Sequence, residues 1–433
     1  MIIDQLNTEL TGGAATAGYR LHHSLRRMGI ESRFWCAKLP RGFHEEGFSV
    51  LPRWSNGESI LHRVQQSWIY LSRKLRWRFD KWRYVQGRSK TLEKFSVPWL
   101  PRNTPFDSSI LSGDVLHLHW VSKFLDMPSF FGTLPLDHPV VWTLHDMSAF
   151  TGGCHHADGC LRFTESCGSC PQLVRGHDRD LSARVFAAKR TAVHRKNLHI
   201  VTPSRWLERL VRQSRILANA SSIQTIYNGL DVRRFTPMDK ATARAELGLK
   251  RDQHVVAFGA ALLANRRKGF VEYLEAMNIV AKSAPVIGLV FGEGDFPAEA
   301  SPSFPIQRVG FLNNADEQRR VYSAADVFVL SSLGENLAQT GVEALACETP
   351  VVAFDVGGLS EYVRTGETGF LAPLSDTGEL AHHIHWLLEH PDECHRMGQA
   401  GRKLVEREFD DIQQADKHAA IYRSLKSASR RAA

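Results

Sequence analysis

The segment "ADVFVLSSLGENLAQTGVEALACETPVVAFDVGG" (residues 325–358) contains two short apolar runs separated by a stretch of helical composition. The runs at 326–332 and 350–356 are rich in β-branched residues, which is typical of strands buried on both faces of a sheet. A strand, a helix and a second strand in succession predict parallel strands joined by a crossover helix. The segment therefore predicts an α/β fold.

The same alternation continues over most of the 433 residues. Further strands are predicted at 114–120, 139–145, 198–204, 223–229, 254–260, 286–292 and 306–311, and helices at 241–249, 269–284, 315–325 and 378–390. This number of strands suggests two sheets, and the chain length suits two or three domains. Asn-Gly and Pro in "YNGLDVRRFTP" mark irregular chain between them. We predict domains at 1–236 and 250–405, followed by a long helix at 408–428.

Composition narrows the functional class. No apolar run is long enough to span a bilayer and the N-terminus lacks a signal pattern, so we expect a cytoplasmic protein. The net charge of +8 indicates acidic partners: phosphates, anionic lipid or nucleic acid. Seven cysteines are an odd number, which together with a cytosolic setting disfavours a disulfide framework.

The opening segment also carries two carboxylates, Glu335 and Glu343. "TGVE" fits a capping box in which Thr340 caps a helix and Glu343 lies three residues on. Both acids would then lie at the carboxyl end of a parallel strand, where open α/β sheets bind ligands. Carboxylates accept from sugar hydroxyls and a helix N-terminus binds phosphate, which together indicate a nucleotide sugar. The alternative is that Glu343 only caps its helix and Glu335 is a solvated loop acid.

"ENLAQTGVE" (335–343) followed by "TPVVAFDVGG" resembles the E-x7-E signature of the retaining glycosyltransferases of family 4 (group 1). Other segments resemble that family in the same order: "TGGAATAGYRLHHSLRRMGIES", "WTLHDMSAFTGGC", "VTPSRWL", "IYNGLDVRRFTP", "RRKGF", "FGEGD", "VGFL" and "GETGFLAP". The resemblance covers most of the chain outside 40–110 and is strongest to exopolysaccharide enzymes of the colanic-acid type.

The resemblance implies the GT-B architecture: two Rossmann-like domains with a cleft between them. The N-terminal domain would bind the acceptor, the C-terminal domain would bind the donor nucleotide, and the helix 408–428 would return to the N-terminal domain. The implied activity is transfer of a sugar, with retention, from a nucleotide sugar to a glycan or polyprenyl-diphosphate-linked saccharide. GT-B enzymes generally need no metal for catalysis.

The resemblance also assigns roles on the donor side. Glu335 would lie beside the donor sugar, Glu343 would bind the ribose, and Lys268 would meet the diphosphate. The loop amides of Asn336, Leu337 and Ala338 would face the sugar and phosphates. Leu263 stands where the family usually has the arginine that partners the lysine, so Arg266 or Arg267 would substitute, and we choose Arg266. The alternative for this basic cluster is a solvated turn.

On the acceptor side, Gly12 and Gly13 match a loop in which the backbone approaches the donor phosphates, as glycine permits. His145 matches the histidine that contacts the donor sugar at the reaction centre. The catalytic prediction is thus His145, Glu335 and Lys268. The alternatives are a plain turn for the glycines and a packed histidine at a sheet edge.

Two rival functions share these residues. A GT-B epimerase would act on the same nucleotide sugar without an acceptor. A catalytically silent sugar-nucleotide sensor or polysaccharide assembly partner would keep the fold alone. A GT-A enzyme would need an Asp-x-Asp metal site, and the "DRD" at 178–180 precedes a helix rather than ending a strand.

The stretch "CHHADGCLRFTESCGSC" is a cysteine-rich loop within 152–171. Cys154, Cys160, Cys167 and Cys170 would make an all-thiolate structural zinc site, with His155 or His156 as a substitute ligand. An irregular loop would gain most from such a metal. The alternative is four reduced cysteines, because the spacing is not that of a standard zinc finger.

A basic insertion spans about 60–95. Trp68, Leu71, Leu75, Phe79 and Trp82 recur at three- and four-residue steps, which predicts one apolar face of a helix rich in Lys and Arg. Such a helix suits peripheral contact with an anionic membrane. The alternatives are a helix packed on the first domain, or nucleic acid, for which no recognised module is present. We therefore expect no nucleic-acid partner.

Glu348 stands in "ACETP" where the family usually has glycine. If the backbone there has a positive φ, the glutamate strains the turn.

Overall fold

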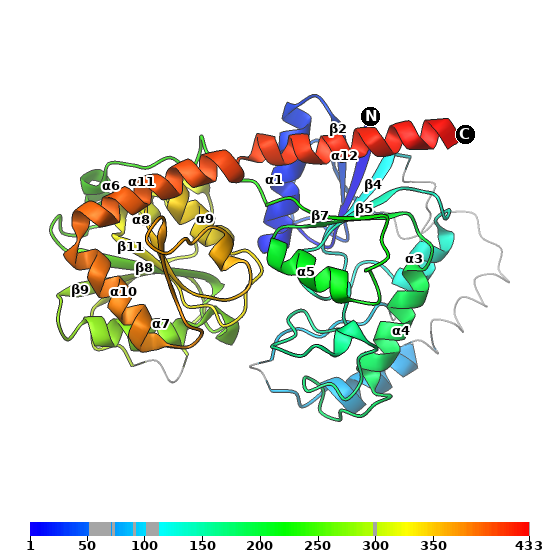
Figure 1. Ribbon diagram of the computed structural model, residues 1–433, viewed down its shortest axis with the longest axis horizontal. Helices are drawn as coiled ribbons and strands as arrows, with labels where there is room; N and C mark the ends of the chain where they lie inside the picture. The colour runs from blue at the N-terminus through cyan, green and yellow to red at the C-terminus, as the bar shows by residue number, and fades with distance from the viewer. Residues whose placement is uncertain (52–70, 72–73, 90–91, 101–111, 298–300, 433) are drawn as a thin grey trace. The chain divides into compact units, whose positions relative to one another are not determined.

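The computed structural model describes residues 1–51, 71, 74–89, 92–100, 112–297 and 301–432 (Figure 1). The chain forms two compact units, one made of Met1–Ile226 with Ala415–Ala433, the other of Tyr227–Gln414. The N-terminal unit therefore ends before the predicted 236. The stretch after Ile226 belongs with the C-terminal unit, where the N–H of Leu230 donates to the carbonyl of Phe409 at 2.7 Å.

The N-terminal unit is built on a seven-stranded sheet in which every pair of neighbouring strands is parallel. Its order is β3-β2-β1-β4-β5-β6-β7, so the winding reverses between β1 and β4. The strands are β1 (Ile2–Asn7), β2 (Glu31–Cys36), β3 (Phe48–Val50), β4 (Val115–Leu118), β5 (Val140–Thr143), β6 (Leu198–Thr202) and β7 (Ser222–Thr225). The helices include α1 (Gly13–Arg27), α3 (Met127–Thr133), α4 (Leu181–Val193) and α5 (Arg205–Gln213).

The C-terminal unit repeats this plan with a six-stranded parallel sheet in the order β10-β9-β8-β11-β12-β13. The strands are β8 (His254–Leu262), β9 (Val286–Glu293), β10 (Ile306–Gly310), β11 (Val327–Leu330), β12 (Val351–Phe354) and β13 (Gly369–Ala372). The helices are α6 (Lys240–Glu246), α7 (Phe270–Val280), α8 (Ala315–Ala324), α9 (Gln339–Ala346), α10 (Thr377–Glu389) and α11 (Pro391–Glu408). Its winding reverses between β8 and β11, as in a doubly wound nucleotide-binding fold.

All nine predicted strands are present, and the α/β prediction is confirmed. The inner strand β2 and the edge strands β3 and β13 were missed. β2 alternates between exposed and buried positions and begins with a charged residue, so it lacks the continuous apolar run used for recognition. β13 begins at Gly369 and has only four residues.

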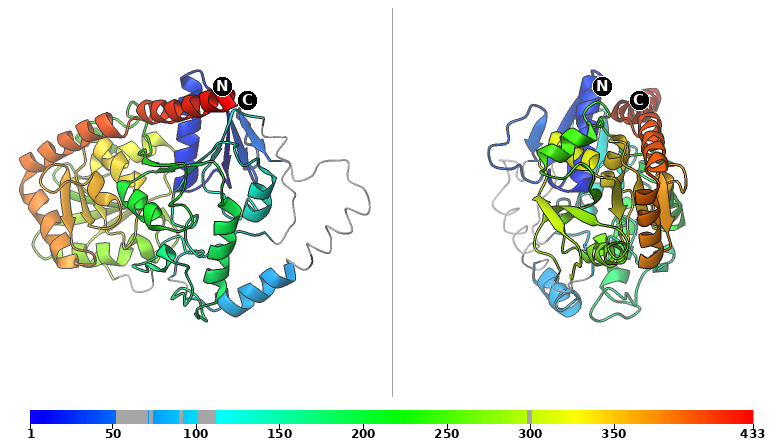
Figure 2. Two further views of the ribbon diagram at one scale, coloured as in Figure 1. Left: turned by 45° about the vertical axis from the view of Figure 1, so that its right-hand side comes forward. Right: turned by 90° about the vertical axis from the view of Figure 1, so that its left-hand side faces the viewer.

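The last helix, α12 (Asp411–Ala432), packs against the N-terminal sheet from Ala415 onward (Figure 2). Ala415, Ala419 and Tyr422 share a buried cluster with Ile3 and Val115. The hydroxyl of Tyr422 lies 2.7 Å from Nδ1 of His117, and Lys426 pairs with Asp114 at 2.8 Å. In the part of the chain that the structure describes, no helix is long and apolar enough to cross a membrane.

Candidate functional site

The two loops at the reversal point of the C-terminal sheet are held together by a glycine. Gly269 follows β8 and has a φ of +71°, and an added Cβ would lie 1.6 Å from the carbonyl oxygen of Ser331. Only glycine allows this approach. The N–H of Leu333 also donates to the carbonyl of Arg267 at 2.8 Å. The short helix Arg266–Lys268 is therefore fixed beside the loop that leaves β11.

Glu335 is the centre of a charged cluster in that loop. Its carboxylate Oε2 accepts from Nζ of Lys268 at 2.5 Å and from Nη1 of Arg267 at 3.2 Å. Only 8% of Glu335 is exposed. Gly357, after β12, has a φ of +65° and its Cβ would meet the Glu335 carbonyl at 1.7 Å, so a third loop closes on the same residue. Two predicted catalytic residues are thus in direct contact.

The arginine beside Lys268 is Arg267 and not the Arg266 that we chose. Arg266 bonds both carboxylate oxygens of Glu272, one of them at 2.7 Å, whereas Arg267 bonds Glu335 and the carbonyl of Gly334. These residues form a 3₁₀ turn, in which neighbouring side chains point about 120° apart. One residue of register therefore decides which arginine reaches Glu335.

The predicted capping box is wrong. α9 begins at Gln339 after Ala338, which has no side-chain oxygen to cap the first turn, so Thr340 lies inside the helix. Glu343 is buried and accepts from the hydroxyl of Tyr322 at 3.0 Å. The N-terminus of α9 is thus suited to an anion bound from outside the chain.

The loop before α9 is held by its carbonyls. The carbonyl of Asn336 accepts from the N–H of Gly358 at 2.8 Å, and that of Ala338 accepts from the hydroxyl of Tyr362 at 3.1 Å. In a trans peptide the N–H points away from the preceding carbonyl. The amides that follow Asn336 and Ala338, those of Leu337 and Gln339, therefore point away from Gly358 and Tyr362.

The N-terminal unit has its own set of candidate residues at the ends of β1, β4 and β5. Gly12 has a φ of +88° and precedes α1, while Gly13 is the first residue of that helix, and a Cβ added to either meets no atom within 4 Å. Gly12 is thus required for its backbone conformation, and neither glycine is required for close packing in the structure as described.

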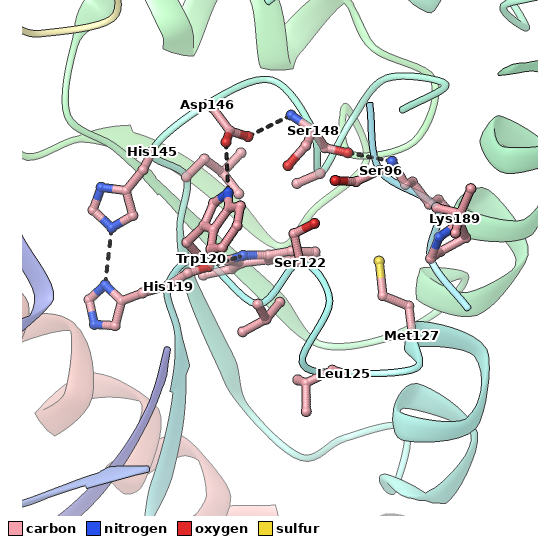
Figure 3. A pocket seen from close by; sticks show the side chains of 16 residues that line it. Ser96, His119, Trp120, Ser122, Leu125, Met127, His145, Asp146, Ser148 and Lys189 are labelled. Atoms are coloured by element: carbon pink, nitrogen blue, oxygen red, sulfur yellow. Dashed lines mark hydrogen bonds between the residues drawn. The ribbon is translucent and has the colours of Figure 1, made fainter. Parts of the chain in front are cut away.

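His145 belongs to a chain of hydrogen bonds that starts in β1. The side-chain amide of Gln5 donates to Ser32 at 2.7 Å and its oxygen lies 2.8 Å from Nε2 of His119. His119 must therefore donate through Nε2 and accept through Nδ1, which lies 3.2 Å from Nε2 of His145 (Figure 3). Burial lowers the pKa of His145 to about 4 and that of His119 well below its usual range. His145 is thus neutral, with Nδ1 as its acceptor nitrogen.

Next to His145, the carboxylate of Asp146 is held in a pocket of the N-terminal unit (Figure 3). It accepts from Trp120 Nε1 at 2.8 Å, from the N–H of Ser148 at 2.7 Å and from His155 Nδ1 at 2.7 Å. Burial would raise the pKa of Asp146, but His155 and the other donors hold it well below the usual range. His155 bonds Ser96 through Nε2 at 2.7 Å, so both of its ring nitrogens are used and it is not free to ligate a metal.

Lys189, which was not predicted from the sequence, lines the same pocket from α4 (Figure 3). Lys189 is buried and donates to the carbonyls of Ser148 and Thr151, the latter at 3.0 Å. Burial lowers the pKa of Lys189 to about 8. Its position inside a helix of mixed composition does not mark it as a functional residue. His119 was not predicted either, but the sequence does mark it: it lies two residues after His117 in "LHLHW", and residues two apart share one face of a strand.

The four cysteines of the predicted zinc site line one small cavity with Phe95 and Phe163. All four are free thiols. Among the described residues, no group of three or more His, Cys, Asp or Glu side chains already stands in an arrangement that holds a metal ion.

Two doubly wound parallel sheets in one chain, each with polar side chains at its reversal point, form the GT-B architecture that glycosyltransferases of solved structure share. Residues 11–234 match Glycosyltransferase Family 4 and residues 239–404 match Glycosyl transferases group 1. The chain belongs to glycosyltransferase family 4.

Curated relatives match parts of the chain. A D-inositol 3-phosphate glycosyltransferase from Mycobacterium sp. (strain KMS) is 37% identical over 186 residues, 40% of either chain. The putative glycosyltransferase EpsD of Bacillus subtilis is 30% identical over 45% of this chain and 52% of its own. The alpha-maltose-1-phosphate synthase of Mycolicibacterium smegmatis is 30% identical over 55% and 65%. In each case the match spans less than two thirds of the relative.

Solved structures show the same fold along the chain. The sucrose-phosphate synthase of Thermosynechococcus elongatus has a TM-score of 0.68 at 19% identity and covers 99% of both chains. Anabaena HepE, solved in complex with UDP-glucose, has a TM-score of 0.64 at 17% identity, over 98% of this chain and all of its own.

Proposed function

We propose that the protein is a retaining glycosyltransferase that transfers a sugar from a nucleotide-sugar donor to a glycan or lipid-linked saccharide. The observation that carries the proposal is the cluster of Lys268, Arg267 and Glu335 beside the N-terminus of α9. It combines cations, helix amides and carboxylates at a sheet reversal, the features that a nucleotide sugar requires. HepE, solved with UDP-glucose, supports a donor of that class.

In the proposed reaction, the bond between the anomeric carbon and the diphosphate breaks, and a bond from an acceptor hydroxyl forms on the same face. The acceptor proton passes to the departing diphosphate. Lys268, Arg267 and the α9 N-terminus stabilise the negative charge that develops on that group. Glu335 orients the sugar, Glu343 holds the ribose, and no metal is required.

We extend the proposal to His145, the residue that the family resemblance assigns to the reaction centre. Its Nδ1 is the acceptor nitrogen of the ring, because Nε2 donates to His119. A neutral imidazole fixed in this tautomer can accept from a sugar hydroxyl but adds no charge.

The test is turnover with a panel of UDP-, GDP- and ADP-sugars, preceded by thermal-shift measurements to find the donor. Lys268→Ala should lower kcat about 10²–10³-fold, the usual cost of removing one donor to a developing charge. Lys282→Ala, which removes an exposed lysine after α7, is the matched control and should retain parent activity. Sugar transfer by Lys268→Ala at the parent rate would refute the assignment.

The same assay separates the rival functions. An epimerase would convert the nucleotide sugar without any acceptor, and product analysis by chromatography detects this. A silent sugar-nucleotide sensor would show a thermal shift with donor and no release of nucleoside diphosphate with any acceptor.

The acceptor side of the proposal includes a membrane contact through the basic insertion. Leu71, Leu75, Phe79 and Trp82 are 45%, 58%, 53% and 61% exposed, so these four side chains of the apolar face are not packed on the described part of the unit. Asp80 faces inward and pairs with Arg184 at 2.6 Å, while Tyr84 packs with Leu173 and Leu181. These contacts hold the helix by its other face. Trp68 lies outside the described residues.

The charge around this apolar face suits an anionic membrane surface. Lys74, Arg76, Arg78 and Lys81 are exposed on the same segment. Basic residues beside exposed apolar side chains are typical of helices that lie in a membrane interface. An acceptor on a polyprenyl diphosphate would be met at such a surface. We place the enzyme in exopolysaccharide biosynthesis on the resemblance of its sequence to that type.

Vesicle sedimentation tests the contact. We expect binding to phosphatidylcholine vesicles containing about one third phosphatidylglycerol, and little binding to phosphatidylcholine alone. Replacing Phe79 and Trp82 by Ser, or Arg76 and Arg78 by Glu, should abolish it. Binding that is unaffected by either pair would refute the contact, and Lys282→Glu serves as the matched charge control.

A further inference from the structure

The cysteine-rich loop of the N-terminal unit has almost no regular structure to hold it. Between Phe150 and Asp180 the only helix is the 3₁₀ turn Arg162–Thr164. The loop nevertheless encloses a cavity, and Cys154, Cys160, Cys167 and Cys170 all line it. Loops of this length without secondary structure need some other source of order.

The turn that carries Cys167 and Cys170 is strained. Cys167, Gly168 and Ser169 have successive φ values of 56°, 102° and 43°, and two of these residues are not glycine. A Cβ on Gly168 would lie 2.5 Å from the carbonyl oxygen of Asp178, so the turn is also tightly packed. Residues in this region of backbone conformation are energetically unfavourable and persist only when their surroundings fix them.

A backbone amide in the loop is directed at one of the sulfurs. The N–H of Gly152 donates to Sγ of Cys167 at 3.2 Å. Hydrogen bonds to a charged group stabilise it, so this donor suits a metal-bound thiolate, the form of cysteine that binds metal.

Two cations hold the chain beside these cysteines. Lys189 is bonded at Thr151, three residues before Cys154, and Arg88 is bonded at Gln172, two residues after Cys170. Lys189 bonds two carbonyls, and Arg88 bonds the carbonyls of Gln172 and Glu93. Within the described residues, neither cation forms an ion pair with a carboxylate. The negative charge of Asp146 nevertheless acts to raise the pKa of Lys189.

Four thiolates on one divalent cation carry a net charge of about −2, which Lys189 and Arg88 would offset.

We propose that Cys154, Cys160, Cys167 and Cys170 bind one zinc ion as a structural site. The four sulfurs are not yet in a coordination arrangement, so binding would draw them toward the centre of the cavity they share. Four protein ligands leave no open position, so the site is structural and separate from the transfer reaction. His155 is not a ligand, because Asp146 and Ser96 use both of its ring nitrogens.

The test is the metal content of the full-length protein, purified without chelator and measured by inductively coupled plasma mass spectrometry. We expect about one zinc per chain. Cys154→Ser and Cys167→Ser should lose it, whereas Cys394→Ser, which removes a buried cysteine of the C-terminal unit, should keep it.

A second measurement protects against variants that misfold. Titrating the parent protein with a mercurial reagent should release zinc in proportion to about four modified thiols, as followed with a chromogenic chelator. Reloading with zinc after chelation should restore the melting temperature. The absence of zinc, or iron in its place, would overturn the proposal. So would about three reactive thiols in the denatured, unreduced chain instead of seven, because the four cysteines would then be paired as disulfides. None of these readouts depends on glycosyltransferase activity.

Discussion

The reversal points of the two sheets carry opposite kinds of chemistry. In the C-terminal unit, Lys268 and Arg267 both form ion pairs with the carboxylate of Glu335. In the N-terminal unit, His119 and His145 are kept neutral by burial and are linked by one hydrogen bond. One fold thus provides either fixed charge or oriented neutral groups, depending on how far the loops exclude water.

This difference predicts how each site responds to change. A paired charge becomes costly when its partner is removed, because the remaining charge is left partly buried. A neutral histidine becomes costly when it is protonated. Substitutions should therefore disturb the C-terminal cluster most, and pH should disturb the N-terminal cluster most.

The largest effect is expected from Glu335→Gln. The amide keeps the shape of the side chain but leaves Lys268 and Arg267 without their anion, so we expect kcat to fall about 10²–10³-fold. The double variant Lys268→Met with Glu335→Gln should lose much less than the sum of the single losses, because the two side chains act as a unit. Steady-state kinetics of the four proteins measure this coupling.

Additive losses in that cycle would show that Lys268 and Glu335 act independently. The comparison between a charged and a neutral reversal point would then lose its basis, because the ion pair would be incidental.

A smaller effect should separate the two adjacent arginines. Arg267→Ala removes a cation from Glu335, and we expect kcat/KM to fall about 10–100-fold, in line with the loss of one charged hydrogen bond. Arg266→Ala breaks the pair with Glu272 on α7 and should mainly lower thermal stability. The reverse result would restore Arg266 as the donor-side arginine.

The third prediction concerns acid stability. The folded-state pKa values of His119 and His145 lie below the usual 6.5. At pH values between the folded-state pKa and 6.5, the unfolded chain therefore binds more protons than the folded chain. The free energy of unfolding is therefore fully retained above about pH 6.5 and falls as the pH decreases toward 4. Each such histidine contributes a slope of up to about 1.4 kcal/mol per pH unit.

His119→Gln should reduce that slope, whatever it does to stability at pH 7.5, because glutamine does not titrate. Urea denaturation followed by circular dichroism at pH 7.5, 6 and 5 measures it. His194→Gln, at an exposed position, should leave the slope unchanged. An unchanged slope in His119→Gln would mean that His119 is not neutral by burial.

The parts of these sites that depend on neighbouring residues in the sequence could be predicted from it. The continuous β-branched runs of β11 and β12 revealed the sheet, and Glu335 and Glu343 could be placed from their distance to those strands. The choice between Arg266 and Arg267 depended on one residue of 3₁₀ register, and the cap at Thr340 depended on where α9 begins. Neither is encoded in hydrophobic periodicity.

The N-terminal unit shows the other limit. Lys189 is a pocket residue only because α4 packs beside the loop that follows β5. The tautomer of His119 depends on Gln5, more than a hundred residues away in the chain. Tertiary contacts of this kind leave no trace in local sequence. The strain at Glu348, in contrast, could be anticipated from the sequence, because backbone strain is a local property.

Glu348 has a φ of 60°, which meets the condition under which a glutamate strains this turn. The N–H of Glu348 donates to the carbonyl of Leu345 at 3.0 Å, and the N–H of Thr349 donates to the carbonyl of Ala344 at 3.0 Å. This is the Schellman pattern that ends many helices, and its left-handed position favours glycine. Glu348 therefore strains the end of α9, the helix that also carries Glu343.

Glu348→Gly should relieve that strain, since a left-handed residue other than glycine costs roughly 1–2 kcal/mol. We expect the melting temperature of the C-terminal unit to rise by about 2–4 °C by differential scanning calorimetry. Glu348→Ala, which removes the charge and keeps the Cβ, should give little or no gain. An equal gain from both variants would assign the effect to charge and not to backbone. Because the substitution leaves Glu335, Arg267 and Lys268 in place, a more stable variant with parent kinetics would show that the charged cluster works independently of the strain at the far end of α9.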